Sequence, residues 1–184
     1  GKQPWPVKVA LASSLGLCIY PLLMLWTSLV GLRLGAVYAW GPPILAAGYL
    51  IFRAISGRTN PVPERNAIKG RRIGQSETFW PDLAFVIVAA LVIFTRFWAL
   101  RNLDAAMWGD GMQHTLIAQL IVDNGGLFNS WLPYADLQTF TYHFGFHSQT
   151  AALHWITGLP VIDATLWSGR LVSRVAVVAG YALA

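Results

Sequence analysis

Four long apolar runs constrain the fold of this chain more than any other feature of its sequence. They cover residues 7–30, 34–52, 79–98 and 162–184. Each is close to the roughly 20 residues that a helix needs to cross about 30 Å of hydrocarbon. Trp80 and Trp98 edge the third run, in the positions that interfacial anchors take in membrane helices. We therefore expect an all-α, polytopic transmembrane protein with about four spans.

Composition favours the same fold class. Hydrophobic residues make up 55% of the chain and charged residues only 11%, which is too apolar for an ordinary soluble domain. The first run is longer than a signal-peptide core and contains Pro21, so we expect a retained span. The chain does not begin with Met, and its last run is still apolar where the sequence stops. We therefore expect a fragment of a longer membrane protein.

The second apolar run contains an unusual helix signal. It carries Gly41, Pro42 and Pro43 in its first half. Proline removes a backbone donor and is tolerated best in the first turn of a helix. The helix is therefore expected either to kink at this point or to begin at Pro42.

The positive charge is concentrated between the second and third runs. Residues 53–78 contain six arginines and lysines against two glutamates. Short basic loops remain in the cytoplasm, and Lys2 and Lys8, two crossings earlier, would lie on the same side. Residues 1–98 are thus expected to form three transmembrane helices with a cytoplasmic loop at 53–78, in a bacterial plasma membrane. Topology explains the net charge of +5, so anionic lipids are compatible partners and nucleic acid is not expected.

The segment 99–161 should then be exoplasmic, and it is rich in polar side chains. It holds all the histidines of the chain and four aspartates: His114, His143, His147, His154, Asp104, Asp110, Asp123 and Asp136. Apolar residues recur at helical spacing over 111–124, with Asp110 as the expected cap and Gly125 as the stop. A second helix is expected over 146–157, ended by Gly158. Both are predicted to be juxtamembrane amphipathic helices, and the truncated fourth span follows at 162–184.

Asp110 is the acid best placed for chemistry in this segment. It follows the third span closely, and His114 lies four positions later, so on a helix the two side chains can share one site. A carboxylate and an imidazole together could act as base and orienter for an acceptor hydroxyl. The alternative is purely structural, with Asp110 capping the helix and His114 facing the lipid headgroups. Spacing leaves both interpretations open.

Three histidines could present a metal site. His143 and His147 are four residues apart and His154 is seven further on, so one helix face could carry all three. Gly145 interrupts this pattern, and no carboxylate lies among them. A divalent metal is therefore not assigned.

Two arginines in the first half of the fourth run carry charges that need compensation in a membrane. Arg170 and Arg174 are four residues apart, and a charge that faces lipid unpaired is costly. They could bind a lipid phosphate, pair with Asp163 or extend to the interface. The sequence does not choose between these roles.

Two stretches of the exoplasmic segment carry a family resemblance. Residues 107–114 read MWGDGMQH and residues 140–147 read FTYHFGFH. These stretches resemble the first-loop region of GT-C-type membrane glycosyltransferases. The order of elements is also similar: a span, a loop that opens on Trp-x-Asp, a surface helix, an aromatic loop, a second surface helix and the next span. The resemblance covers about residues 85–174.

This resemblance implies transfer of a sugar from a polyprenyl-phosphate carrier to an acceptor at the outer membrane face. The catalytic role falls on Asp110 as base with His114 beside it, and Asp104 is the reserve candidate. The expected substrate-binding residues are Asp104, Tyr142, His143, His147, Arg170 and Arg174. The two arginines would hold the donor phosphate. Many members have a second acid where this chain has Gly111, so the lipid-linked sugar is the only small molecule that the resemblance implies.

Two other classes of function fit the same sequence. A non-catalytic accessory subunit would pack through its spans against a larger respiratory or photosynthetic membrane complex, using small residues such as Gly16 and Ala89 at close helix contacts. A transporter would need polar groups along a path through its spans, and Arg96, Arg170 and Arg174 supply few of them. The length of the complete protein distinguishes the enzyme from the subunit.

Overall fold

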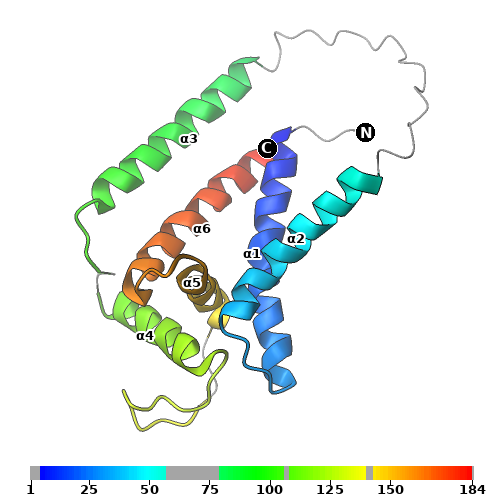
Figure 1. Cartoon of the computed structure of the whole chain (residues 1–184). Coiled ribbons are helices and arrows are strands. Elements are labelled where there is room, and N and C mark those ends of the chain that lie inside the picture. The colour runs from blue at the N-terminus through cyan, green and yellow to red at the C-terminus, as the bar shows by residue number, and fades with distance from the viewer. Residues whose placement is uncertain (1–4, 57–78, 106–107, 140–142, 184) are drawn as a thin grey trace.

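The computed structural model describes residues 5–56, 79–105, 108–139 and 143–183. Within these ranges the chain is all-helical, which confirms the all-α part of the prediction. The six helices are α1 (Trp5–Leu29), α2 (Ala36–Ser56), α3 (Phe79–Leu100), α4 (Trp108–Asn124), α5 (Phe144–Thr157) and α6 (Val161–Leu183) (Figure 1). Outside the helices, the described backbone forms one isolated antiparallel bridge, between Ser130 and Gln138.

The four apolar runs become α1, α2, α3 and α6, and each helix ends within four residues of its predicted limits. Helix α2 continues through Pro42 and Pro43. The prediction that this helix begins at Pro42 was therefore wrong, because the two prolines lie more than one turn inside it. A proline inside a helix leaves the carbonyl four residues earlier without its usual donor.

Tyrosine hydroxyl groups join the proline-containing turns of α1 and α2. The carbonyl of Ala39, four residues before Pro43, accepts a hydrogen bond from the Tyr20 hydroxyl at 3.0 Å. In the opposite direction, the Tyr38 hydroxyl donates to the Tyr20 carbonyl at 2.6 Å. The tyrosine rings meet edge to face with centroids 5.5 Å apart. The tyrosines thus satisfy a carbonyl that the helix cannot pair and fix α1 against α2.

The proline of α1 is compensated in the same way by α5. Pro21 frees the carbonyl of Leu17, and the Gln149 side-chain amide donates to that carbonyl at 3.1 Å. Non-helical or interrupted backbone is tolerated in an apolar environment only when its polar groups find partners in the protein. Side chains of α1 and α5 therefore supply donors for the carbonyls that Pro43 and Pro21 leave unpaired.

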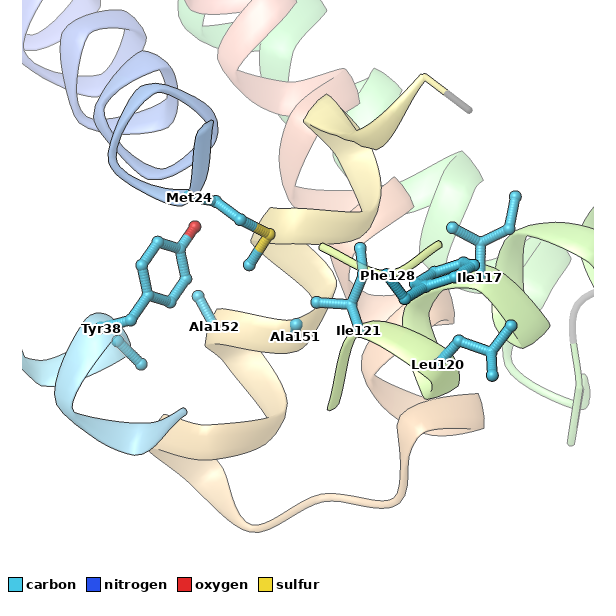
Figure 2. Close-up of a cluster of buried hydrophobic side chains, with 9 residues drawn as sticks. Met24, Tyr38, Ile117, Leu120, Ile121, Phe128, Ala151 and Ala152 are labelled. Atoms are coloured by element: carbon cyan, nitrogen blue, oxygen red, sulfur yellow. The ribbon is translucent and has the colours of Figure 1, made fainter. Parts of the chain in front are cut away.

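Helix α5 is the centre of the structure and packs against α1, α2, α4 and α6. Small residues make these close contacts, since Ser148, Ala151 and Ala152 are buried. Figure 2 shows Ala151 and Ala152 between Met24 and Tyr38 on one side and the side chains of α4 on the other. The buried cluster is made of Met24, Tyr38, Ala39, Ile117, Leu120, Ile121, Phe128, Ala151 and Ala152. This core fixes α4, which carries the candidate chemistry, onto α5.

Much of the apolar surface of the first three helices is left uncovered. In the described part of the chain α3 packs against α6 alone, and Trp80 and Leu45 are 72% and 75% exposed. By length and apolarity, α1 is the described helix that can cross a membrane: its segment Val7–Leu29 has a mean hydropathy of 1.9, and only 11% of the most apolar stretch is buried. A shorter apolar segment, Leu83–Ala99, lies in α3. Four spans remain a prediction.

Candidate functional site

The candidate site lies on the first half of α4. The helix begins at Trp108, so Asp110 is in its first turn and does not cap it. The prediction of a helix starting at Gly111 with Asp110 as its cap was therefore wrong. A carboxylate in the first turn still interacts favourably with the helix dipole. Asp110 is exposed, and within the described residues no hydrogen bond or ion pair joins it to His114. Its carboxylate therefore faces the surroundings of the protein.

The end of α4 is as predicted. Gly125 has φ of 66° and follows the last helical residue, Asn124. Its N–H donates to the Val122 carbonyl at 3.2 Å, and the Gly126 N–H donates to the Ile121 carbonyl at 3.0 Å. The left-handed glycine closes the helix in the usual way. It also brings the end of α4 to the turn between α1 and α2, where the Gly35 N–H donates to the Gly125 carbonyl at 3.4 Å.

An imidazole pair joins α4 to α5. His114 Nδ1 and His147 Nε2 are 2.8 Å apart, and His147 Nδ1 is 2.7 Å from the His143 carbonyl oxygen. The two rings are tilted by 37° with centroids 5.0 Å apart, and Phe146 contacts both of them edge to face. His114 is exposed, whereas His147 is fully buried. A buried polar ring thus fixes the orientation of an exposed one.

His147 is held in its neutral form. Burial lowers its pKa to about 4, while the hydrogen bond to the His143 carbonyl partly offsets that decrease and the neighbouring His114 adds to it. Desolvation disfavours the imidazolium because the charge loses its water. At neutral pH His147 therefore acts as an uncharged hydrogen-bonding group.

The three histidines considered for a metal site, His143, His147 and His154, do not form a common site. His154 Nδ1 is 2.7 Å from the Leu159 carbonyl and closes the end of α5, next to Gly158 with its φ of 73°. Among the described residues, no group of three His, Cys, Asp or Glu side chains could hold a metal ion. Helix α5 begins at Phe144, two residues before its predicted start, so His143 becomes its N-terminal cap residue.

The two arginines of α6 stack on aromatic rings. The Arg174 guanidinium lies 3.9 Å from the centroid of Phe97 on α3, and that of Arg170 lies 5.0 Å from the centroid of Trp167. Within the described structure Arg174 forms no salt bridge with Asp163. Arg174 Nε and Nη2 are buried and have no hydrogen-bond partner among the described residues. Buried guanidinium donors without partners are suited to an anion such as phosphate.

Two predicted substrate-binding residues have little structural context. Asp104 is exposed and lies between α3 and α4. Tyr142 lies outside the described residues. Their predicted roles therefore remain predictions.

A hollow lies on another face of α4. It has a volume of about 530 Å³ and is lined by α4, the start of α6, Ala105 and Tyr134. Its α4 residues are Met112, Thr115, Leu116 and Gln119. By helical spacing, Asp110 and His114 lie on the same face of α4 as Ile117 and Ile121. Those two isoleucines belong to the buried cluster between α4 and α5. The hollow and the candidate chemistry are thus separated by the helix.

Comparison with known protein families, curated proteins and solved structures gives no match for this chain. The functional argument therefore depends on its own residues and their geometry.

Sequence reasoning selected His114 and His147 but missed that they form a pair. The partners lie 33 positions apart, so no local spacing relates them. It also missed Gln149 and Tyr20 as partners of freed carbonyls. For these two the sequence did contain a signal, because each proline within a predicted span requires a donor from elsewhere.

Proposed function

We propose that this chain is part of a polytopic membrane glycosyltransferase of the GT-C type, which transfers a sugar from a lipid-phosphate carrier at the outer membrane face. The observation that carries the proposal is the exposed acid and imidazole face of α4. There Asp110 and His114 lie one helical turn apart, and His114 is anchored to the buried His147. An imidazole held in this way beside an exposed carboxylate suits activation of a hydroxyl, with one group as base and the other as orienter.

The surface of the helices supports a membrane environment for this reaction. Helix α1 is long and apolar enough to cross a bilayer, and large apolar side chains on α2 and α3 are exposed. Exposed apolar surface on this scale marks contact with lipid or with other helices. In the proposed topology of four spans, the basic loop 53–78 is cytoplasmic and the segment 99–161 is exoplasmic.

The transfer step requires a base and a means of stabilising the leaving group. The acceptor hydroxyl gives its proton to the α4 site while its oxygen forms a bond to the anomeric carbon of the sugar. The bond from that carbon to the phosphate oxygen breaks, and its electron pair leaves with the lipid phosphate. The buried guanidinium donors of Arg174 support a role in binding that phosphate, with Arg170 beside it.

A transfer assay tests the proposal directly. The full-length protein, in liposomes, is given a panel of radiolabelled sugars linked to polyprenyl phosphate, and transfer to an acceptor is measured. Asp110→Asn is expected to reduce the rate by about 100-fold or more, because it removes the carboxylate from the base-and-orienter pair. Asp136→Asn is the matched control, because Asp136 is also exposed but lies in the loop between α4 and α5. A wild-type protein that transfers no sugar from any donor would refute the function.

A second candidate function is favoured by α3. This helix packs only against α6 in the described structure and leaves apolar side chains uncovered on its other faces. A non-catalytic subunit of a larger membrane complex would cover these faces with helices of its partner. Mild solubilisation would then yield a fixed complex whose activity is unchanged by Asp110→Asn.

A further inference from the structure

We infer that His114 Nε2 is the atom that accepts the proton of the acceptor hydroxyl, and that His147 is the positioning residue that directs it. The inference rests on the proposed function for the identity of the substrate. It gives His114 the role of base and leaves Asp110, one turn away on α4, to orient the acceptor hydroxyl.

The hydrogen-bond directions follow from one fixed acceptor. A backbone carbonyl can only accept, so His147 Nδ1, at 2.7 Å from the His143 carbonyl, must carry a proton. In a neutral ring the other nitrogen, Nε2, then has a lone pair and no proton. His114 Nδ1, 2.8 Å from that nitrogen, must therefore donate to it. The carbonyl thus determines the protonation of both rings.

This chain of bonds leaves His114 with its lone pair on Nε2 whenever the ring is neutral. Nε2 is not hydrogen-bonded within the described structure, and the side chain is exposed. The second ring nitrogen of a base is commonly oriented by an acceptor that fixes the tautomer. Here an unusual acceptor, a buried imidazole, takes the place that a carboxylate has in many enzymes.

His147 is suited to this role because it stays uncharged. Its burial disfavours the imidazolium, so its Nε2 remains an acceptor through the neutral pH range. The titratable groups around the pair are Asp110, one turn from His114 on α4, and His143, the cap residue of α5. When His114 takes up the substrate proton, its Nδ1–H keeps its bond to His147, so the imidazolium is stabilised without a rearrangement.

The first test determines the tautomers of His114 and His147 and does not require an activity assay. Histidine labelled with ¹⁵N is incorporated into the full-length protein, and NMR assigns the protonated nitrogen of each ring at pH 7.5. Free neutral histidine prefers the Nε2–H form, whereas His114 and His147 are both expected as Nδ1–H. His147→Leu removes the acceptor, and the signal of His114 is expected to revert to Nε2–H. A wild-type His114 with its proton on Nε2 would overturn the inference.

The second test measures sugar transfer by variants of His114 and His147. His114→Ala is expected to lower kcat by about 100-fold or more and to be rescued by added imidazole, whereas Asp110→Asn is not rescued. His147→Gln keeps an acceptor near the position of Nε2 and should retain more activity than His147→Leu, with an altered pH profile in the leucine variant. Equal activity of His114→Ala and the wild type would exclude His114 as the base even if the NMR result held. Absence of transfer by the wild type would refute the proposed function itself, while the tautomers would still be decided by NMR.

Discussion

At the scale of single residues, two of the carbonyls that prolines free in the long helices have specific donors. The Tyr20 hydroxyl donates to the Ala39 carbonyl, which Pro43 leaves without a helical donor. Tyr20→Phe is expected to lower the free energy of unfolding by about 1 to 2 kcal/mol, because a partly buried carbonyl then lacks a partner. Thermal denaturation of the protein in detergent measures the change.

The matched control for this prediction is Tyr49→Phe. Tyr49 lies on the same helix as Ala39 but is 62% exposed, so loss of its hydroxyl should change stability very little. Equal effects of the two substitutions would show that the Ala39 carbonyl does not depend on Tyr20.

His147 gives the fold a dependence on pH. Its pKa falls from 6.5 to about 4 on folding, so between these values the unfolded chain binds a proton that the folded chain does not. The stability that neutral His147 contributes is complete above pH 6.5 and is lost as the pH falls toward 4. The total loss is about 3 kcal/mol, and it should appear as a decrease in Tm over this range.

Substitution by a group that does not titrate isolates this contribution. His147→Gln should show a shallower decrease of Tm between pH 6.5 and 4 than the wild type. His154→Gln is the comparison, since His154 lies on the same helix but contacts the Leu159 carbonyl at its end. Parallel curves for the wild type and His147→Gln would contradict the assignment.

Local sequence patterns predicted only part of the candidate site. Asp110 and His114 were placed on one helix because their spacing matches the helical repeat. The start of that helix was missed, since an N-cap preference is worth only about 1 kcal/mol and does not prevent Trp108 and Gly109 from joining the helix. The pairing of His114 with His147 depends on how α4 packs against α5, which no local pattern specifies.

At the scale of helices, one glycine controls how α4 meets the turn between α1 and α2. Gly125 adopts φ of 66°, and a Cβ there would lie 3.6 Å from Arg33 Cβ. Space is therefore sufficient, and the penalty comes from the backbone. Gly125→Ala is expected to cost about 1 to 2 kcal/mol of stability, the usual penalty for a left-handed residue with a Cβ.

Gly126→Ala is the matched control at the next position. Gly126 does not have a positive φ, and its Cβ would make an ordinary contact of 3.7 Å with Ser28 Oγ. Its effect on Tm should be clearly smaller than that of Gly125→Ala. The opposite order would mean that close packing, and not backbone conformation, selects glycine at this turn.

The helices themselves were largely predictable because apolar runs of this length have few alternatives to helix. The central position of α5 could not be predicted in this way. Its buried face is made of Ser148, Ala151 and Ala152, which are small residues that give almost no signal on a hydrophobicity scale. They become informative only when four neighbouring helices are seen to approach them.

At the scale of the whole molecule, the side of the membrane on which the α4 site lies depends on α3. This helix separates the basic loop 53–78 from the segment that contains Asp110 and His114. Its most apolar part, Leu83–Ala99, has 17 residues, which at about 1.5 Å per residue is slightly shorter than the hydrocarbon core. The Arg101 guanidinium packs 3.9 Å from the centroid of the Trp98 ring, an arrangement suited to the interface at the end of a span.

Cysteine labelling in intact cells decides whether α3 crosses. In a Cys18→Ser background, which removes the free thiol of α1, single cysteines are introduced as Asp136→Cys and Gln75→Cys. A membrane-impermeant maleimide is expected to label position 136 and to reach position 75 only after the cells are permeabilised, because one crossing by α3 places the two positions on opposite sides. Labelling of both positions in intact cells would mean that α3 lies along the membrane. The basic loop and the α4 site would then share one side, and a lipid-linked donor presented at the outer face could reach the site only if that shared side were the outer one.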